Sequence, residues 1–121
     1  MIGLTKKEEK LIVSLQQKKF RKAEGLFFVE GIKMVQEAIS SSFIVRFVVA
    51  SIDYTTEKVT VKNCDERTMQ RISAFKTAPG ILAVVEIPQL QALVNAATTL
   101  VLEKVQDPGN FGTIVRTAEA L

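Results

Sequence analysis

Short apolar runs alternate with amphipathic segments along most of the chain, and this alternation constrains the fold more than any other feature. The runs are too short for helices, and the longest is rich in Val, Ile and Phe, as buried strands are. We predict strands at residues 26–29, 43–50, 59–63, 81–87 and 100–102. Strands separated by helices favour a layered α/β domain with a mainly parallel or mixed sheet.

Amphipathic segments between these runs predict two helices in the middle of the chain. Glu30-Gly31 leads into the first, which should end at the serines 40–42, and Asp65 fits the N-cap of the second. Their apolar residues fall at helical spacing, so we expect one face of each helix to be buried against the sheet. The inward-facing residues are Ile32, Val35, Ala38 and Ile39 in the first helix, and Met69, Ile72 and Phe75 in the second.

A cluster of cations follows another predicted helix, which the capping-box spacing of Thr5 and Glu8 places from about residue 6 toward residue 17. The cations surround Phe20 and are Lys18, Lys19, Arg21 and Lys22. Cations at a helix C-terminus complement its dipole, and they can also contact phosphate. One or two cations satisfy a helix end, so both explanations stay open and the surplus favours a phosphate-contacting patch.

Composition narrows the classes of function. The formal net charge is +3 and is uneven, because residues 1–33 carry eight basic against four acidic side chains and the remainder carries eight against nine. The chain has no histidine and one cysteine, Cys64, which leaves no plausible zinc site, no His-based catalysis and no internal disulfide. We interpret Cys64 as a small thiol without a special role, and we expect no bound metal.

The 121 residues, 47% of them hydrophobic, suit one compact domain or one domain plus a fragment. No apolar run approaches the roughly 18 residues of a membrane span. The first ten residues lack the apolar core of a signal peptide. We therefore expect a cytoplasmic protein with no membrane partner.

The densest turn cluster of the chain follows the short run 100–102. It consists of Asp107, Pro108, Gly109, Asn110 and Gly112. The helical spacing of the apolar residues after it predicts a helix that carries Ile114, Val115, Ala118 and Leu121. In open α/β sheets, ligands bind beyond the carboxyl ends of strands, where a glycine-rich loop and the next helix present free N–H groups. We therefore expect a functional site in this loop.

Seven residues of this segment stand in one register: Asp107, Pro108, Asn110, Gly112, Arg116, Thr117 and Ala118. In this register the segment resembles motif 1 of the SpoU/TrmH family of RNA 2′-O-ribose methyltransferases, a strand followed by D-P-x-N-x-G-x-x-x-R-T-A. Seven typed positions are much more specific than a lone glycine-rich loop. One departure is Glu103, since the family has an aspartate just after the strand.

Earlier parts of the chain resemble the N-terminal substrate-binding domain of the same family, a small α/β/α sandwich related to ribosomal proteins that bind kinked RNA. Its opening signature is matched by Phe20-Arg21, Phe28-Val29-Glu30-Gly31, Val35 and Glu37-Ala38. Its closing strand is matched by residues 79–84. The resemblance thus spans nearly the whole chain, with its pieces in the family's order.

The resemblance implies an α/β fold class in three parts. An RNA substrate-binding domain occupies residues 1–88, a linker residues 89–98, and the first strand and helix of a truncated trefoil-knotted methyltransferase domain residues 99–121. The family binds S-adenosylmethionine through two later motifs, so no residue of this chain is expected to bind that cofactor. Because Leu121 falls in mid-helix, we expect the N-terminal part of a longer, homodimeric enzyme that is inactive as this chain alone.

The resemblance also implies roles for individual residues. Arg116 is the implied catalytic residue, which activates the ribose 2′-hydroxyl and holds an RNA phosphate; because guanidinium stays protonated in proteins, electrostatic orientation is the safer role. Asn110 is implied on the phosphate side of the site, with a simple turn role as the alternative. The implied contacts to the backbone of the RNA, expected to be ribosomal, are Lys18, Lys19, Arg21 and Lys22.

Two other functions stay open. One is a non-catalytic RNA-binding module that recognises bent RNA. The other is an α/β protein-interaction domain with a fortuitous loop. Salt dependence separates them, because phosphate contacts weaken as the salt concentration rises.

Overall fold

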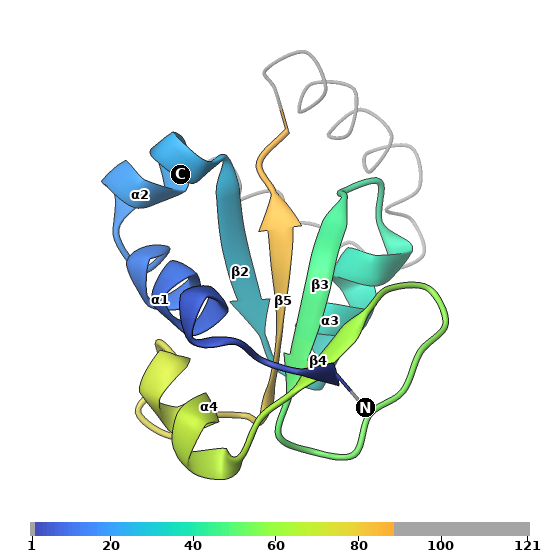
Figure 1. Cartoon of the computed structure of the whole chain (residues 1–121). Coiled ribbons are helices and arrows are strands. Elements are labelled where there is room, and N and C mark those ends of the chain that lie inside the picture. The colour runs from blue at the N-terminus through green and yellow to red at the C-terminus, as the bar shows by residue number, and fades with distance from the viewer. Residues whose placement is uncertain (1, 89–121) are drawn as a thin grey trace.

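The computed structural model describes residues 2–88, which form a mixed α/β fold around a five-stranded sheet (Figure 1). The elements in chain order are β1 (Ile2–Gly3), α1 (Lys6–Ser14), α2 (Lys18–Glu24), β2 (Leu26–Glu30), α3 (Ile32–Ser40), β3 (Val45–Ala50), β4 (Val61–Asn63), α4 (Glu66–Ile72) and β5 (Ile81–Glu86).

The strands lie in the order β1-β4-β3-β5-β2. The β4 strand pairs in parallel with both β1 and β3, whereas β5 runs antiparallel to both β3 and β2. The register places Val84 of β5 opposite Phe28 of β2, and Ala83 opposite Val48 of β3. The predicted mixed sheet is therefore confirmed, and β5, which lies between β3 and β2, is the last of these strands in the sequence.

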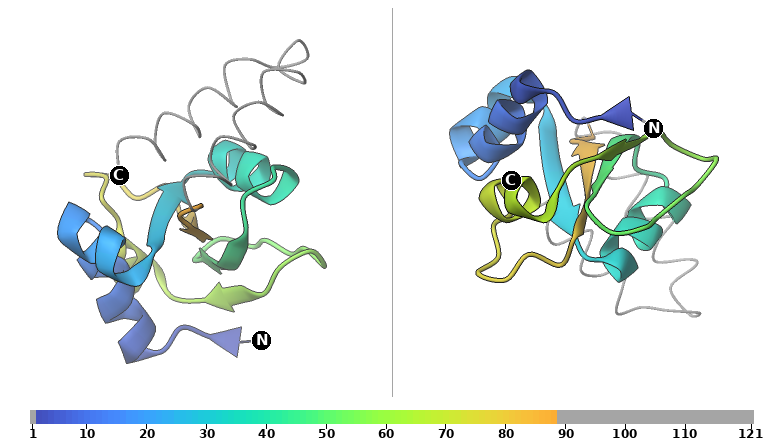
Figure 2. Two further views of the ribbon diagram at one scale, coloured as in Figure 1. Left: turned by 90° about the horizontal axis from the view of Figure 1, so that it is seen from above. Right: turned by 60° about the horizontal axis from the view of Figure 1, so that its bottom comes forward.

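Two apolar cores lie on the two faces of the sheet, because successive side chains of a strand point to opposite faces. On β5, Ile81, Ala83 and Val85 belong to the core under α3, while Leu82 and Val84 belong to the core under α1 and α4. Figures 1 and 2 show α3 on one side of the sheet and α1 and α4 on the other. Each fully buried Val, Leu or Ile side chain contributes about 1.5–3 kcal/mol.

The α1 and α4 helices begin where the sequence predicts. The Thr5 hydroxyl accepts a hydrogen bond from the Glu8 N–H at 3.1 Å, and the Glu8 carboxylate accepts one from the Thr5 N–H at 2.9 Å, which completes a capping box. At the start of α4, the Asp65 carboxylate accepts a hydrogen bond from the Thr68 N–H at 2.7 Å. Both caps satisfy backbone donors that a helix start otherwise leaves unpaired.

The predicted inward faces are correct except at two positions. Val35, Ala38, Met69 and Ile72 are buried, but Ile32 is 45% exposed and Phe75 is 53% exposed. Ile32 is the first residue of α3, before the helix passes over the sheet. Phe75 lies beyond the end of α4, because Ser73 is extended and interrupts the helical spacing. The predicted strand 43–50 also begins later, at Val45, so that Ile44 is exposed.

Glu30, at the end of β2, has a structural role. Glu30 is 8% exposed, and its carboxylate accepts hydrogen bonds from the Ser73 hydroxyl at 2.6 Å and from the Ala74 N–H at 2.8 Å. The Gly31 N–H donates to the Ile81 carbonyl at 2.9 Å. The predicted opening and closing signatures therefore meet at one end of the sheet, where Glu30 also fixes the segment that follows α4.

Candidate nucleic-acid interface

The cations near Phe20 lie on a separate short helix, α2, and not at the end of α1. The α1 helix ends at Ser14, whose hydroxyl donates to the Leu11 carbonyl at 2.6 Å, and a turn follows. Lys18 and Lys19 therefore stand at the N-terminus of α2, where the helix dipole disfavours cations. The explanation that these two lysines complement the dipole of a helix C-terminus is therefore wrong, because they lie at the positive end of a helix dipole.

Arg21 has a structural contact that the sequence did not predict. Its guanidinium Nη1 donates to the Leu15 carbonyl at 3.0 Å, at the C-cap of α1. The side chain is half-buried, and its Nε has no hydrogen-bond partner among residues 2–88. Arg21 thus fixes the corner between α1 and α2, and it is the least accessible of the four predicted phosphate contacts.

The three lysines of α2 are exposed and have no ion-pair partner within residues 2–88. Lys18 and Lys22 are four residues apart, so they share one face of the helix. Lys19 Nζ lies 4.9 Å from the centre of the Phe20 ring, which is itself 37% exposed. The structure thus brings together an accessible basic surface and an exposed aromatic ring.

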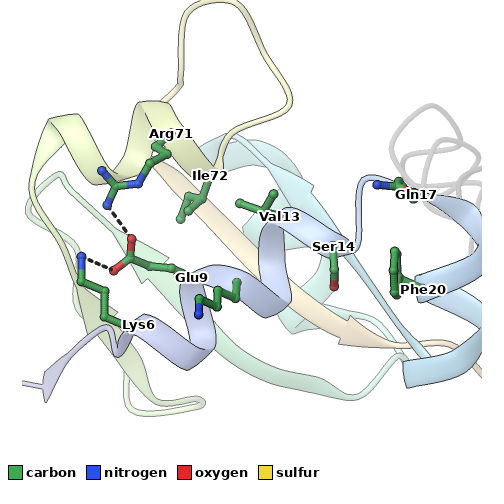
Figure 3. A pocket seen from close by; sticks show the side chains of 9 residues that line it. Lys6, Glu9, Val13, Ser14, Gln17, Phe20, Arg71 and Ile72 are labelled. Atoms are coloured by element: carbon green, nitrogen blue, oxygen red, sulfur yellow. Dashed lines mark hydrogen bonds and ion pairs between the residues drawn. The ribbon is translucent and has the colours of Figure 1, made fainter.

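A groove with a volume of about 440 Å³ lies beside this surface, between α1, α2 and α4 (Figure 3). The apolar residues of α1 and α2 that line it are Val13 and Phe20. The full lining is Lys6, Glu9, Lys10, Val13, Ser14, Gln17, Phe20, Arg71 and Ile72. Figure 3 shows the residues of α1 along the groove, with Phe20 at one end and Arg71 at the other.

Glu9 holds two cations at this far end. Arg71 Nη2 lies 2.5 Å from Glu9 Oε1, and Lys6 Nζ lies 3.8 Å from Glu9 Oε2. The hydrogen bond from Arg71 is the main reason that the pKa of Glu9 lies below its ordinary value of 4.5. The groove therefore carries three cations, Lys6, Lys10 and Arg71, against one carboxylate, and its field favours an anionic ligand.

Sequence reasoning did not find this groove. Lys6, Lys10, Val13 and Gln17 follow a helical spacing that could have marked one face of α1. Arg71 gave no such signal, because it reaches the groove from α4, and Glu9 lies 62 residues before it in the sequence. Only the packing of α4 against α1 places these side chains together.

The two catalytic residues that the sequence predicts, Asn110 and Arg116, lie outside the described residues. Within residues 2–88, no group of three or more His, Cys, Asp or Glu side chains is placed to hold a metal ion. The helices of this same part of the chain are too short or too polar to cross a lipid bilayer.

Residues 6–83 match the family model of the MRM3-like substrate binding domain. The chain is also 32% identical over 111 residues to the 23S rRNA (guanosine(2553)-2′-O)-methyltransferase RlmP of Bacillus subtilis (strain 168), in a match that covers 88% of this chain and 44% of that protein. The chain thus spans less than half the length of this relative.

Two solved structures have a similar fold. One, from Porphyromonas gingivalis, is assigned to the TrmH family of RNA methyltransferases; it is 28% identical, with a TM-score of 0.60 over 70% of this chain and 36% of its own. The other is an rRNA methyltransferase from Sinorhizobium meliloti with bound AdoMet, 23% identical, with a TM-score of 0.59 over 71% of this chain and 35% of its own. The chain belongs to the SpoU/TrmH family of RNA methyltransferases, and its residues 6–83 form an MRM3-like substrate-binding domain.

Proposed function

We propose that the chain is the N-terminal portion of an S-adenosylmethionine-dependent 2′-O-ribose methyltransferase that acts on ribosomal RNA. The surface of α2 carries this proposal: Lys18, Lys19 and Lys22 are exposed and unpaired within residues 2–88, on a domain whose family binds the substrate. Lysines in this state contact phosphates without reading the base sequence, as a substrate-positioning domain requires.

Each of the three proposed segments of the chain has its own role. Residues 1–88 hold the RNA as an α/β/α sandwich comparable to ribosomal proteins that bind kinked RNA. Residues 89–98 link this domain to residues 99–121, which begin the knotted catalytic domain. Helices on both faces of the sheet support the sandwich. The homodimer and the cytoplasmic location of the intact protein belong to the same proposal.

The chemistry is the displacement of a methyl group from a sulfonium by a ribose 2′-hydroxyl. We assign Arg116 to orient this hydroxyl and to hold an adjacent phosphate, and Asn110 to the phosphate side of the loop. The methyl donor, when bound, supplies the methyl group. The groove of residues 2–88 does not fit this donor, because its excess of cations repels the positively charged sulfonium and ammonium groups.

The enzymatic part is tested on the RNA itself. Ribosomal RNA from cells that lack the full-length gene should have lost one ribose methyl group, which mass spectrometry detects and locates. Complementation with the full-length Arg116→Ala variant should not restore it, whereas Arg46→Ala, which removes an exposed arginine of β3, should. Intact methylation in the deletion strain contradicts the proposal.

The RNA-binding part is tested on the 121-residue chain. The double variant Lys18→Gln/Lys22→Gln should bind an RNA hairpin more weakly, and the slope of log affinity against log salt should fall by about 1.5, or about 0.7–0.9 for each lost phosphate contact. The matched control is Lys7→Gln/Lys58→Gln, which removes two exposed lysines outside α2. Equal slopes for both double variants contradict a specific role of α2.

A non-catalytic RNA-binding module is the second candidate, favoured by the same exposed lysines. It predicts the same salt dependence in the binding experiment. It also predicts intact ribose methylation in the deletion strain, which separates it from the enzyme.

A further inference from the structure

We propose that the groove between α1, α2 and α4 binds a single unpaired nucleotide of the RNA. This inference rests on the proposed function, because it names the form of RNA that the substrate-binding domain selects. Three properties of the groove lead to it: an exposed aromatic ring, an excess of cations and an unpaired carboxamide.

The first property is the apolar wall. Phe20 is 37% exposed and Val13 is 43% exposed, and both line the groove. A flat ring left accessible in a basic surface is the usual platform for an unpaired base, which stacks on it regardless of base identity. A base inside a duplex has no free face to offer, so the ring selects an unpaired one.

The second property is charge. Glu9 is held between Arg71 and Lys6, so the single carboxylate of the groove is neutralised from both sides, and Lys10 adds a further cation. At the other end, Lys19 Nζ lies 4.9 Å from the centre of the Phe20 ring. A base at Phe20 would therefore have ammonium groups within reach of the phosphates that flank it.

The third property is hydrogen bonding. The Gln17 carboxamide lines the groove next to Phe20 and has no hydrogen-bond partner among residues 2–88 (Figure 3). Ser14, by contrast, already donates its hydroxyl proton to Leu11. Proteins read unpaired RNA bases through their hydrogen-bonding edges, and the Gln17 carboxamide offers such an edge both a donor and an acceptor. The volume of about 440 Å³ lies within the range of about 300–1,000 Å³ for small-ligand sites.

Two RNA hairpins of equal length test this inference, one fully paired and one with a single bulged nucleotide. The 121-residue chain should bind the bulged hairpin more tightly. Phe20→Leu keeps an apolar side chain but removes the ring, so it should weaken binding of the bulged hairpin by about 5- to 150-fold and leave the paired hairpin little changed. Phe20→Tyr should retain the preference, and so should Phe75→Leu, which removes an aromatic ring outside the groove.

The affinity for the paired hairpin also reports whether each variant is folded. If the wild-type chain binds both hairpins equally, or if Phe20→Leu keeps the preference for the bulge, the inference is overturned, while salt-dependent binding leaves the proposed function standing. If neither hairpin is bound, or if an acidic peptide of equal charge binds more tightly than both, the proposed RNA function fails as well.

Discussion

Lys62 of β4 and Glu8 of α1 form an ion pair in which Lys62 Nζ lies 2.6 Å from Glu8 Oε2. The same ammonium lies 5.3 Å from the centre of the Phe47 ring, so it joins the first helix to the sheet. Burial alone raises the pKa of Glu8, but hydrogen bonds from Lys62 and Thr5 outweigh this effect and hold the pKa below its ordinary value of 4.5. The ion pair therefore makes the stability of the domain depend on the pH.

We predict that the 121-residue chain loses stability in acid. The pKa values of Glu8, Glu9 and Asp65 are all lowered in the folded state, so their contribution is present above the ordinary values of 4.5 and 3.8. It is lost as the pH falls through the lower folded pKa values. Urea unfolding at pH 7 and at about pH 3 measures this loss.

The Lys62→Gln variant isolates one part of the acid effect. It should cost about 1 kcal/mol at neutral pH, near the upper end for ion pairs at a surface, and less in acid. An unchanged cost at both pH values would show that Lys62 acts through packing on Phe47 rather than through its charge.

The buried carboxylate of Glu30 should be more sensitive to mutation than any exposed one. Glu30→Ala leaves the Ser73 hydroxyl and the Ala74 N–H without their acceptor, at about 1–3 kcal/mol for the buried hydroxyl and less for the N–H, because Ala74 is exposed to water. Glu30→Gln retains one acceptor oxygen and should cost less. The matched control is Glu57→Ala in the exposed β3–β4 loop, whose unfolding midpoint should stay close to wild type. Equal midpoints for Glu30→Ala and Glu57→Ala would contradict the assigned role.

Gly80 has a conformation that requires glycine. Its φ is +89°, and a Cβ there would lie 2.8 Å from Ile52 Cγ2. We predict that Gly80→Ala costs about 1–2 kcal/mol from the backbone, plus a contribution from the contact. The double variant Gly80→Ala/Ile52→Ala should cost less than the two single variants together, because it removes the contact but not the strain. Gly25→Ala is a useful comparison, since Gly25 has a φ of +67° and no atom within 4 Å of its added Cβ.

Cys64 should be unreactive in the folded domain. Burial, together with the nearby Asp65 and Glu9 carboxylates, raises the pKa of its thiol from 9.0 to about 11. At pH 8 the thiolate fraction is about 100-fold smaller than in an unfolded chain, but a thiolate of higher pKa is also more nucleophilic, so alkylation by iodoacetamide should slow by about 10- to 100-fold. Mass spectrometry of the alkylated chain gives the rate, and urea should restore it. Rapid alkylation without denaturant would contradict the burial of this thiol.

Periodicity and caps identified most elements of residues 2–88, because these signals are local. Thr5, Glu8 and Asp65 cap helices through neighbours three residues away, and the apolar run predicted as a strand at residues 81–87 forms the buried strand β5. The two-residue β1 carries no such pattern, and only its pairing with β4 makes it a strand.

The candidate interface was predicted in part, and the missing part is tertiary. The sequence shows the lysines of α2 as a charge cluster. The break between α1 and α2 could not be predicted, because it contains no glycine or proline. Arg21 closes that break by donating to Leu15, a contact that no spacing rule indicates. The pair of Glu9 with Arg71 likewise depends on how α4 packs, so the groove emerged only from the structure.

The position of β5 has a consequence for how the domain is made. This strand leaves the ribosome after β2 and β3, yet it lies between them and supplies side chains to both cores. Until Glu86 has emerged, the nascent chain presents two unpaired strand edges and two open apolar faces, which is the state most prone to pairing with other chains. Translation must therefore deliver β5 before β2 can join the sheet, and a pause just ahead of β5 is where this domain is most exposed to aggregation.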